Sequence, residues 1–317
     1  MQKYILRRLA LMVPTLFGLT VLVFIMVRLL PGDVVTLILG DFGASSPEVR
    51  EAMIRDFGLD ENIPVQYVRW FGNIATGDLG SSLVSGRPVT EEIGRRLPIS
   101  LQLGLTAIVF SVLIGVPIGT WSAIRQNSFV DYAGRSLAIG LLAAPNFWIA
   151  LLLIAMAGRY FQWGVPPTTY PHLTDDPVAN IRFIIVPALL IGGAASGSVM
   201  RFTRTSMLEV LRQDYVRTAW AKGLREQTII MRHVLKNAMI PVVTVVGLSI
   251  PGIITGSVII EQVYSIPGMG RYYLQAINRV DLPVIQGIVL VFGLAVLLVN
   301  LAVDLSYSWL NPRIRYS

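Results

Sequence analysis

The sequence predicts an all-α integral membrane protein with six transmembrane helices, and three observations lead to this fold class. Charged residues make up 14% of the 317 residues, whereas an ordinary soluble domain carries about 25%. Apolar residues account for 54%, and the mean hydropathy is +0.63. The apolar residues gather in six long runs without Asp, Glu, Lys or Arg. Core helices of a soluble protein would need a larger polar shell than this chain supplies, which argues against that alternative.

Each run meets the requirement of about 20 predominantly apolar residues for crossing the hydrocarbon core. The runs cover approximately residues 9–27, 99–121, 137–157, 183–200, 239–260 and 283–303. Prolines interrupt several of them, which membrane helices tolerate because neighbouring helices re-satisfy the freed backbone groups. The fourth run is the shortest and is rich in glycine, alanine and serine. This composition favours close helix packing over contact with lipid.

The N-terminus resembles a secretory signal peptide, because Lys3, Arg7 and Arg8 precede an apolar run. The run is longer than the apolar region of such a peptide, and no small-residue cleavage site follows it. We therefore expect an uncleaved first span.

The charges outside the runs predict the orientation. If the N-terminus is cytoplasmic, six spans return the C-terminus to the same side. The cytoplasmic segments then hold 15 bases and 5 acids, a net charge of +10, and the opposite side holds 11 bases and 14 acids, a net charge of −3. A cytoplasmic excess of Lys and Arg is the feature that sets topology. The overall charge of +7 is therefore an orientation signal, which argues against nucleic-acid binding.

Three parts of the chain are expected. Residues 1–30 form a cytoplasmic N-terminus and the first span, residues 31–98 a small helical external domain, and residues 99–317 a transmembrane core with a cytoplasmic loop at 201–238. Within the external domain, Ser46-Pro47 and Pro64 are helix-start signals. The apolar residues of this segment are too frequent for a disordered linker.

The cytoplasmic loop 201–238 is basic, since it holds 8 of the 15 cytoplasmic bases, and its pattern is helical. Apolar residues at helical spacing form one stripe on a short helix: Val216, Ala219, Trp220, Gly223 and Leu224. Lys222-Gly223 predicts the end of this helix. Two interpretations stay open on the pattern alone: a helix that lies on the lipid surface, and a docking helix for a cytoplasmic partner.

The sequence lacks the residues and motifs on which several kinds of site depend. Without cysteine there is no disulfide framework and no zinc site of the Cys type. The phosphate-binding pattern G-x-x-x-x-G-K-[ST] does not occur. The two histidines, His172 and His233, fall on opposite sides of the membrane, so a Ser–His or metal-dependent site at membrane depth has no histidine. The spans also lack the carboxylates of proton-coupled and ion-coupled carriers. A pore subunit that depends on another protein for energy fits this pattern.

Five ordered motifs resemble those of ABC-transporter permeases, and more narrowly the dipeptide/oligopeptide/nickel permease family. Residues 214–224, DYVRTAWAKGL, resemble the coupling ("EAA") loop of such permeases. The other motifs are LLPGD at 29–33, APNFW at 144–148, RFTRTSMLEV at 201–210 and YSIPGMG at 264–270. The resemblance covers nearly the whole chain and is to the first of the family's two paired permease subunits, which carry a large external loop after span one.

The sequence departs from the general permease pattern at two places. Arg217-Thr218-Ala219 stands where that pattern has Glu-Ala-Ala, and Pro241 is the nearest equivalent of its distal Ile-x-Leu-Pro, at a different spacing. The arginine argues against carrying over any salt bridge from other branches of the family.

The resemblance implies an importer in the bacterial inner (plasma) membrane. Two homologous permease subunits would form the pathway, two cytoplasmic ABC ATPases would supply energy, and a periplasmic or lipid-anchored solute-binding protein would deliver the solute. It implies no catalytic residue, cofactor or metal in this chain, because ATP with Mg²⁺ would be used by the ATPases. The residues expected to couple to the ATPases are Asp214, Tyr215, Val216, Arg217, Thr218, Ala219, Trp220, Lys222, Gly223 and Leu224. In this interpretation the apolar stripe enters a groove of the ATPase.

Polar residues inside the spans are candidates for the translocation pathway, although interhelical hydrogen bonds account for each of them as well. These candidates are Gln102, Asn146, Ser196, Thr244 and Ser249. Two other functions are weighed against the permease. A stand-alone secondary transporter predicts inverted repeats around a midplane site, and a membrane enzyme predicts a nucleophile–base pair at depth. The sequence displays neither feature. Di- and oligopeptides, glutathione, nickel chelates and opine-like compounds all stay open as solutes.

Overall fold

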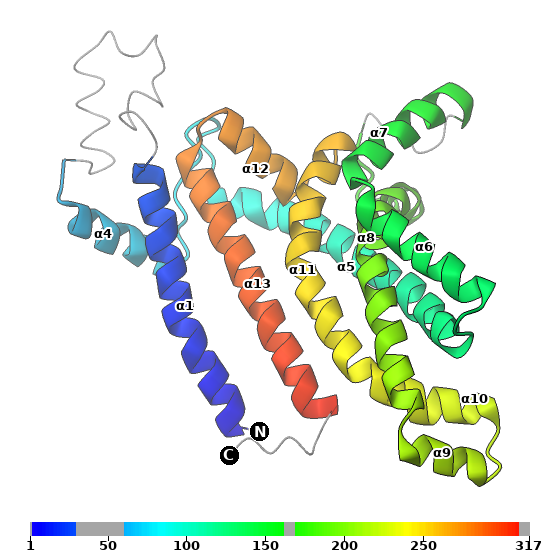
Figure 1. Ribbon diagram of the computed structural model, residues 1–317. Coiled ribbons are helices and arrows are strands. Elements are labelled where there is room, and N and C mark those ends of the chain that lie inside the picture. The colour runs from blue at the N-terminus through cyan, green and yellow to red at the C-terminus, as the bar shows by residue number, and fades with distance from the viewer. Residues whose placement is uncertain (1, 30–59, 162–168, 311–317) are drawn as a thin grey trace. The chain divides into compact units, whose positions relative to one another are not determined.

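The computed structural model describes residues 2–29, 60–161 and 169–310, and almost all of their regular structure is helical (Figure 1). The elements are α1 (Gln2–Arg28), α4 (Ile63–Ala75), α5 (Val89–Ile124), α6 (Phe129–Ala143), α7 (Asn146–Met156), η1 (Ala157–Phe161), α8 (Pro177–Leu211), α9 (Asp214–Ala221), α10 (Glu226–Thr228), η2 (Ile229–Leu235), α11 (Lys236–Val263), α12 (Met269–Asn278) and α13 (Leu282–Leu310). The segments η1 and η2 are π-helical. These ranges contain one isolated antiparallel bridge, Ser81 with Pro88.

Five helices are long and apolar enough to cross a membrane, and they confirm the first, second, fourth, fifth and sixth predicted runs. The membrane-length segments are Arg8–Arg28, Val89–Ile124, Pro177–Leu211, Glu226–Ile254 and Leu282–Ser306. The helices α6 and α7 pass the same criterion only as a sharply bent pair, which is the geometry of either a broken sixth span or a re-entrant loop.

The third predicted run, 137–157, is not one continuous helix. The axes of α6 and α7 differ by 92°. Ala144 is extended, at φ −83° and ψ 124°, and Pro145 follows as the N-cap of α7. A proline ring disfavours the helical conformation at the residue before it, so the apolar run folds as two half-length helices. Hydrophobicity predicted its extent, and the break follows from Pro145.

The chain contains two compact units, each described here by itself. Unit 1 comprises residues 1–98 and 271–297, and unit 2 comprises residues 99–270 and 298–317. Both α5 and α13 contribute residues to each unit.

Unit 2 has an apolar core between α5, α8 and α11. Its buried side chains include Leu103, Ile184, Ile191, Ile253 and Ile260. The small residues of the fourth run allow close helix packing, as predicted: a Cβ atom added to Gly197 of α8 would lie 2.8 Å from the carbonyl oxygen of Ala138 in α6. A glycine of α5 makes a similar approach to α8. A Cβ atom added to Gly119 of α5 would lie 2.6 Å from the carbonyl oxygen of Met200 in α8. Close helix packing by small residues is therefore confirmed, and it holds α5 against α8.

The described part of the predicted external segment lies in unit 1. Pro64 stands in the first turn of α4, as predicted, whereas Ser46-Pro47 falls outside the described residues. The segment's last ten residues, 89–98, form the first turns of α5. Glu91 and Glu92 stand in the first turn of this helix, where carboxylates are favoured by the helix dipole.

Candidate functional site

The connection between α8 and α11 contains a short helix, α9, that ends where the sequence predicts. Gly223 has φ +73°, a left-handed conformation that glycine adopts without steric penalty. Its N–H donates to Trp220 O at 2.9 Å, and the Leu224 N–H donates to Ala219 O at 3.4 Å. This pair of hydrogen bonds is the Schellman motif, which closes a helix by satisfying its last carbonyls. The helix stop at Lys222-Gly223 is confirmed.

One face of α9 is packed inside unit 2. Val216 and Ala219 are buried in a cluster with Met207 of α8 and with Ile229 and Val234 of η2. The predicted apolar stripe is therefore not one surface turned toward a partner. Because the stripe is broad, its inner half forms the chain's own core. In contrast, Trp220 and Leu224 on its flank are 47% and 40% exposed.

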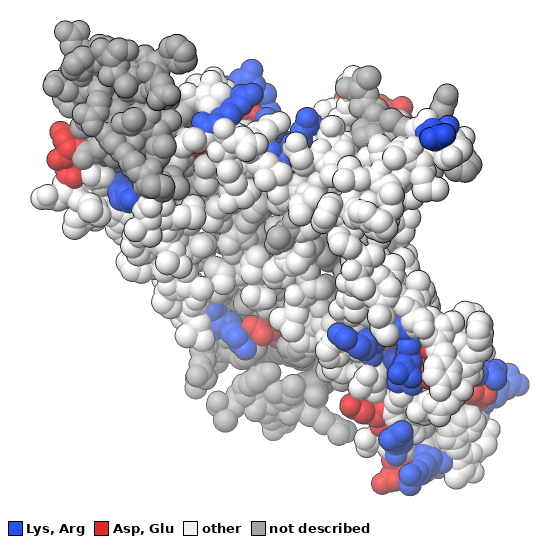
Figure 2. Space-filling view, turned by 45° about the horizontal axis from the view of Figure 1, so that its top comes forward, with Lys and Arg blue, Asp and Glu red and all other residues white. Residues whose placement is uncertain are grey.

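The remaining coupling residues lie at the surface. We define the outer face of α9 as its exposed side chains: Asp214, Tyr215, Arg217, Thr218, Trp220, Lys222 and Leu224. Arg217 and Asp214 are 3.5 Å apart and both strongly exposed, so their attraction contributes little to stability. Figure 2 shows Lys and Arg side chains gathered over the end of unit 2 that carries α9 and α10. The outer face thus combines an exposed indole with basic groups that remain available to an acidic surface.

Tyr215 connects α9 to the beginning of α11. The Asn237 side-chain amide donates to the Tyr215 hydroxyl at 3.1 Å and to His233 O at 2.7 Å. His233 belongs to the π-helical segment η2. Together with the buried Val216, this contact joins α9 to two long helices, so a displacement of α9 would be transmitted to both α8 and α11.

A buried ion pair joins three helices in unit 2. Asp131 of α6 is fully buried and accepts from Arg204 of α8 at 2.7 Å (Nε) and 2.8 Å (Nη2). The Ser122 hydroxyl of α5 donates to Asp131 at 2.5 Å, and the Asn127 N–H donates at 3.0 Å. Sequence reasoning counted Asp131 and Arg204 as cytoplasmic charges without pairing them. They are separated by 73 positions, and no spacing rule connects them.

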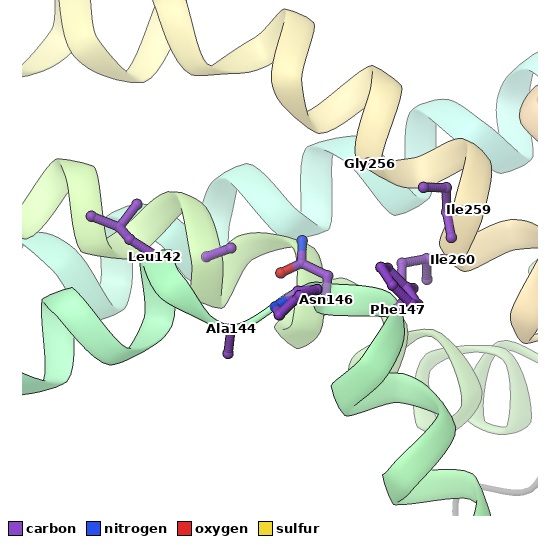
Figure 3. Close-up of a pocket in the computed structure, with 9 residues that line it drawn as sticks. Leu142, Ala144, Asn146, Phe147, Gly256, Ile259 and Ile260 are labelled. Atoms are coloured by element: carbon purple, nitrogen blue, oxygen red, sulfur yellow. The ribbon is translucent and has the colours of Figure 1, made fainter.

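A pocket of about 330 Å³ lies at the break between α6 and α7 (Figure 3). Asn146 is the polar side chain among its lining residues, which are otherwise Leu142, Ala144, Pro145, Phe147, Ala194, Gly256, Ile259 and Ile260. The volume lies at the lower end of the range of about 300–1,000 Å³ typical of small-molecule sites. Asn146 is thus the pathway candidate that the structure places at a cavity.

The other four pathway candidates are not brought together. Gln102 donates to Asn180 of α8 at 2.5 Å, an interhelical hydrogen bond. Ser196 donates to Gly193 O at 2.6 Å and Ser249 to Val246 O at 2.6 Å, both within their own helix. Thr244 likewise contacts Ile240 O at 3.4 Å. Gln102 therefore makes the interhelical hydrogen bond that was the alternative explanation, whereas the bonds described for Ser196, Thr244 and Ser249 lie within their own helices.

Glu261 is a buried carboxylate that sequence reasoning did not single out. It follows the fifth predicted run directly, is fully buried, and accepts from the Ser100 hydroxyl and the Gly270 N–H, both at 2.7 Å. The Ser100 hydroxyl in turn accepts from Met269 N–H at 2.8 Å. Burial raises the pKa of Tyr264, three positions further along the chain, to about 12. The glutamate therefore fixes the loop after α11 to α5.

Unit 1 contains a polar cavity of about 170 Å³. Three arginines line it (Arg87, Arg96 and Arg279), together with Glu92 and Asp281. Glu92 is 3.2 Å from Arg87 and 2.7 Å from Arg96, and Asp281 accepts from the Ser82 hydroxyl at 2.6 Å. Burial, followed by the two carboxylates, raises the pKa of the Tyr272 hydroxyl at this cavity. The lining of this cavity is therefore strongly charged. Among the described residues, no group of three or more His, Asp or Glu side chains could hold a metal ion.

Comparison with known proteins adds a consistent set of relatives. The family described as "Binding-protein-dependent transport system inner membrane component" matches residues 115–316, and its N-terminal counterpart matches residues 1–104. The chain is 37% identical to the dipeptide transport system permease protein DppB of Escherichia coli K12, over 100% of this chain and 99% of that protein. It is 37% identical to the oligopeptide transport system permease protein AppB of Bacillus subtilis, over 100% of both.

A solved structure confirms the fold. A chain of the MetNI methionine ABC transporter, in an inward-facing conformation, matches with a TM-score of 0.57. The match covers 69% of this chain and 96% of that chain at 13% identity.

Proposed function

This chain belongs to the family of binding-protein-dependent transport system inner membrane components, and we propose that its solutes are peptides. It is a multi-pass inner membrane protein and a permease subunit of an ABC importer, as the family and the full-length relatives establish. A dipeptide permease and an oligopeptide permease, from two different bacteria, are each 37% identical to it along essentially their whole length. That similarity supports peptides over the other solutes considered.

The outer face of α9 is proposed to dock on a cytoplasmic ATPase. One observation carries this proposal: α9 is held rigidly from one side by Val216 and Ala219, while its other side exposes Trp220 and basic groups to solvent. An exposed indole beside cations suits an apolar pocket with an acidic rim, because Trp and Arg are the residues that most often carry binding energy. The lipid-surface alternative would place the same indole in the membrane.

The conformational step proceeds from α9 to the spans. Closure of the ATPases would move α9, and its buried face would carry α8 and α11 with it. The Asp131–Arg204 pair would extend the displacement to α6, and Ser122 would extend it to α5. This is a two-state element biased from the cytoplasmic side, a common arrangement in switching proteins. The N- and C-termini are then cytoplasmic, as the charge distribution predicts.

The other parts of the assembly follow from the same proposal. A second homologous permease would complete the pathway, two ABC ATPases would consume ATP with Mg²⁺, and a periplasmic or lipid-anchored solute-binding protein would deliver the peptide. This chain would bind no cofactor and catalyse no reaction. Asn146 would offer its amide to a passing peptide backbone. The charged cavity of unit 1 would contact the binding protein. The proposed domains are residues 1–30, residues 31–98 and residues 99–317, and the last of these contains the coupling loop 201–238.

The test compares charge reversals at two exposed arginines. Arg217→Glu lies on the outer face of α9, and the control Arg135→Glu lies at an exposed position of a different helix, α6. We expect Arg217→Glu and Trp220→Asp to abolish co-purification of the ATPase and ATP-dependent peptide uptake while membrane insertion persists. Arg135→Glu should retain both. Full uptake by Arg217→Glu and Trp220→Asp would refute the docking role of α9, and failure of any ATPase to co-purify with the unaltered chain would refute the assembly.

A further inference from the structure

The first span provides a depth scale for unit 1. Its membrane-length segment, Arg8–Arg28, has 21 residues, which at 1.5 Å per residue extend about 30 Å, the thickness of the hydrocarbon core. Arg8 and Arg28 therefore mark the two edges of that core. Phe17 is 11 positions from Arg28, which places it about 16 Å below that edge, near the middle of the bilayer.

The helix α4 is joined to the Arg28 half of this span by aromatic contacts. Tyr67 has its ring centroid 5.2 Å from Phe24 and 6.1 Å from Phe17, and Phe71 lies 6.3 Å from Phe17. The hydroxyls of Tyr67 and Thr20 are hydrogen-bonded at 2.8 Å. Side chains of α4 therefore reach residues of α1 that stand at the depth of the hydrocarbon core.

The start of α4 lies at the edge of the span. Arg28 donates a short hydrogen bond to the Gln66 side chain, and its guanidinium stacks on the Phe24 ring at 3.5 Å. The only charge within α4 itself is Arg69, which is paired with Glu61 at 2.6 Å. With Gln66 and Asn73, Arg69 forms one polar stripe at helical spacing. Such a stripe matches the polar face of a helix at the boundary of head groups and acyl chains.

A second apolar face of α4 points away from α1 and is open in the described structure. Its exposed large side chains include Val65 at 49% and Val68 at 68%. The neighbouring helix α1, a membrane-length span, likewise exposes large apolar side chains, Val13 and Leu22 among them. Three of the last four carbonyls of α4 accept hydrogen bonds: Gly72 and Asn73 accept from Thr76, and Ile74 accepts from Gly77. Hydrocarbon requires this internal satisfaction of the backbone.

We propose that α4 is an amphipathic helix embedded in the leaflet at the Arg28 end of the first span, with Val65 and Val68 against lipid acyl chains. The proposal goes beyond the transport function, because it assigns lipid as the occupant of this face. It also removes α4 from the surface available to a solute-binding protein. With a cytoplasmic N-terminus, the leaflet is the outer one.

Because this chain contains no cysteine, one introduced cysteine is its single thiol, and the assembly with the unaltered chain, treated with the same label, measures the background from the partner subunits. Val65→Cys, Val68→Cys and Asn73→Cys are each labelled with a nitrobenzoxadiazole fluorophore and reconstituted in phosphatidylethanolamine–phosphatidylglycerol vesicles. Quenching is measured with doxyl-labelled phospholipids in the membrane and with iodide in the water. We expect labels at Val65 and Val68 to show blue-shifted emission, quenching by doxyl lipids and loss of iodide quenching. The label at Asn73, on the polar stripe, should be quenched more strongly by iodide than either.

Two results would overturn the proposal. Iodide quenching at Val65 and Val68 equal to that at Asn73 would place α4 in water. Protection of both positions from both quenchers would mean that protein, not lipid, covers this face. Two variants on the apolar face keep the test decisive if one label disturbs assembly. Peptide uptake by the labelled assemblies is a separate readout, so failure of the transport function and failure of the lipid contact are distinguishable.

Discussion

Breaking the Asp131–Arg204 pair should destabilise unit 2 strongly. Asp131 is fully buried and Arg204 largely so, and the carboxylate accepts hydrogen bonds from Arg204, Ser122 and Asn127. Removing one partner of a buried ion pair leaves an uncompensated charge and costs about 3–5 kcal/mol. We therefore expect Arg204→Met, which keeps the length of the aliphatic chain, to lower the free energy of unfolding by about that amount.

A double-mutant cycle isolates the pair energy. In Asp131→Leu/Arg204→Met neither charge remains, and replacement of a buried pair by apolar residues is often neutral. We expect the double variant to lose much less stability than the sum of the single variants, which is a positive coupling. The exposed pair of Glu91 and Arg95, with both side chains at least half exposed at 2.5 Å, is the control and should contribute about 0–1 kcal/mol.

The assay is denaturant-induced unfolding of the purified chain in detergent micelles, followed by circular dichroism. If Arg204→Met costs no more than Arg95→Gln, then the buried carboxylate is solvated in some other way and the argument from burial is refuted. Additive single effects would refute the direct pairing even if each effect were large.

Three further changes test other packing features. Gly223 has φ +73°, so Gly223→Val should cost about 1–2 kcal/mol and Gly223→Asn less, read as thermal stability and ATPase co-purification of the two variants. Glu261→Ala leaves the buried donors of Ser100 and Gly270 without their acceptor and should lower the free energy of unfolding by about 1–3 kcal/mol. Glu261→Gln keeps one acceptor oxygen, so equal thermal midpoints for the two variants would contradict this role. Gly119→Ala places a methyl group against a backbone carbonyl and should lower the free energy of unfolding by about 1–3 kcal/mol. The control is Gly140→Ala, because a Cβ atom there has no neighbour within 4 Å. It should be neutral or stabilising in the same unfolding assay.

Much of the fold could be predicted because hydrophobic length is a local property of the sequence. The first, second, fourth, fifth and sixth spans each correspond to an uncharged run, and the helix stop at Gly223 follows from local backbone chemistry. The bend between α6 and α7 was missed although Pro145 was visible, because prolines are also common inside continuous membrane helices. Indeed, Pro187 stays within the unbroken α8.

The candidate site was predictable in position but not in orientation. The spacing of Val216, Ala219 and Trp220 identified one face of a helix, yet it could not indicate which part of that face the chain itself would bury. Asp131 and Arg204 were visible only as charges, since their contact depends on how α6 and α8 pack. Among the pathway candidates, polarity alone singled out Ser196 and Asn146 equally. The fold then satisfied Ser196 within its own helix and placed Asn146 at a pocket.

The buried and exposed faces of α9 should tolerate substitutions differently. Val216 and Ala219 must fit side chains of the same chain, so a change there requires a compensating change within one gene. Arg217, Trp220 and Lys222 have exposed side chains, so under the proposed docking role they could change together with the surface of a docked subunit. In a cell with several related importers, substitutions at a few exposed positions of α9 could therefore make each permease specific for its own ATPase. The buried residues that hold the helix in place would not need to change.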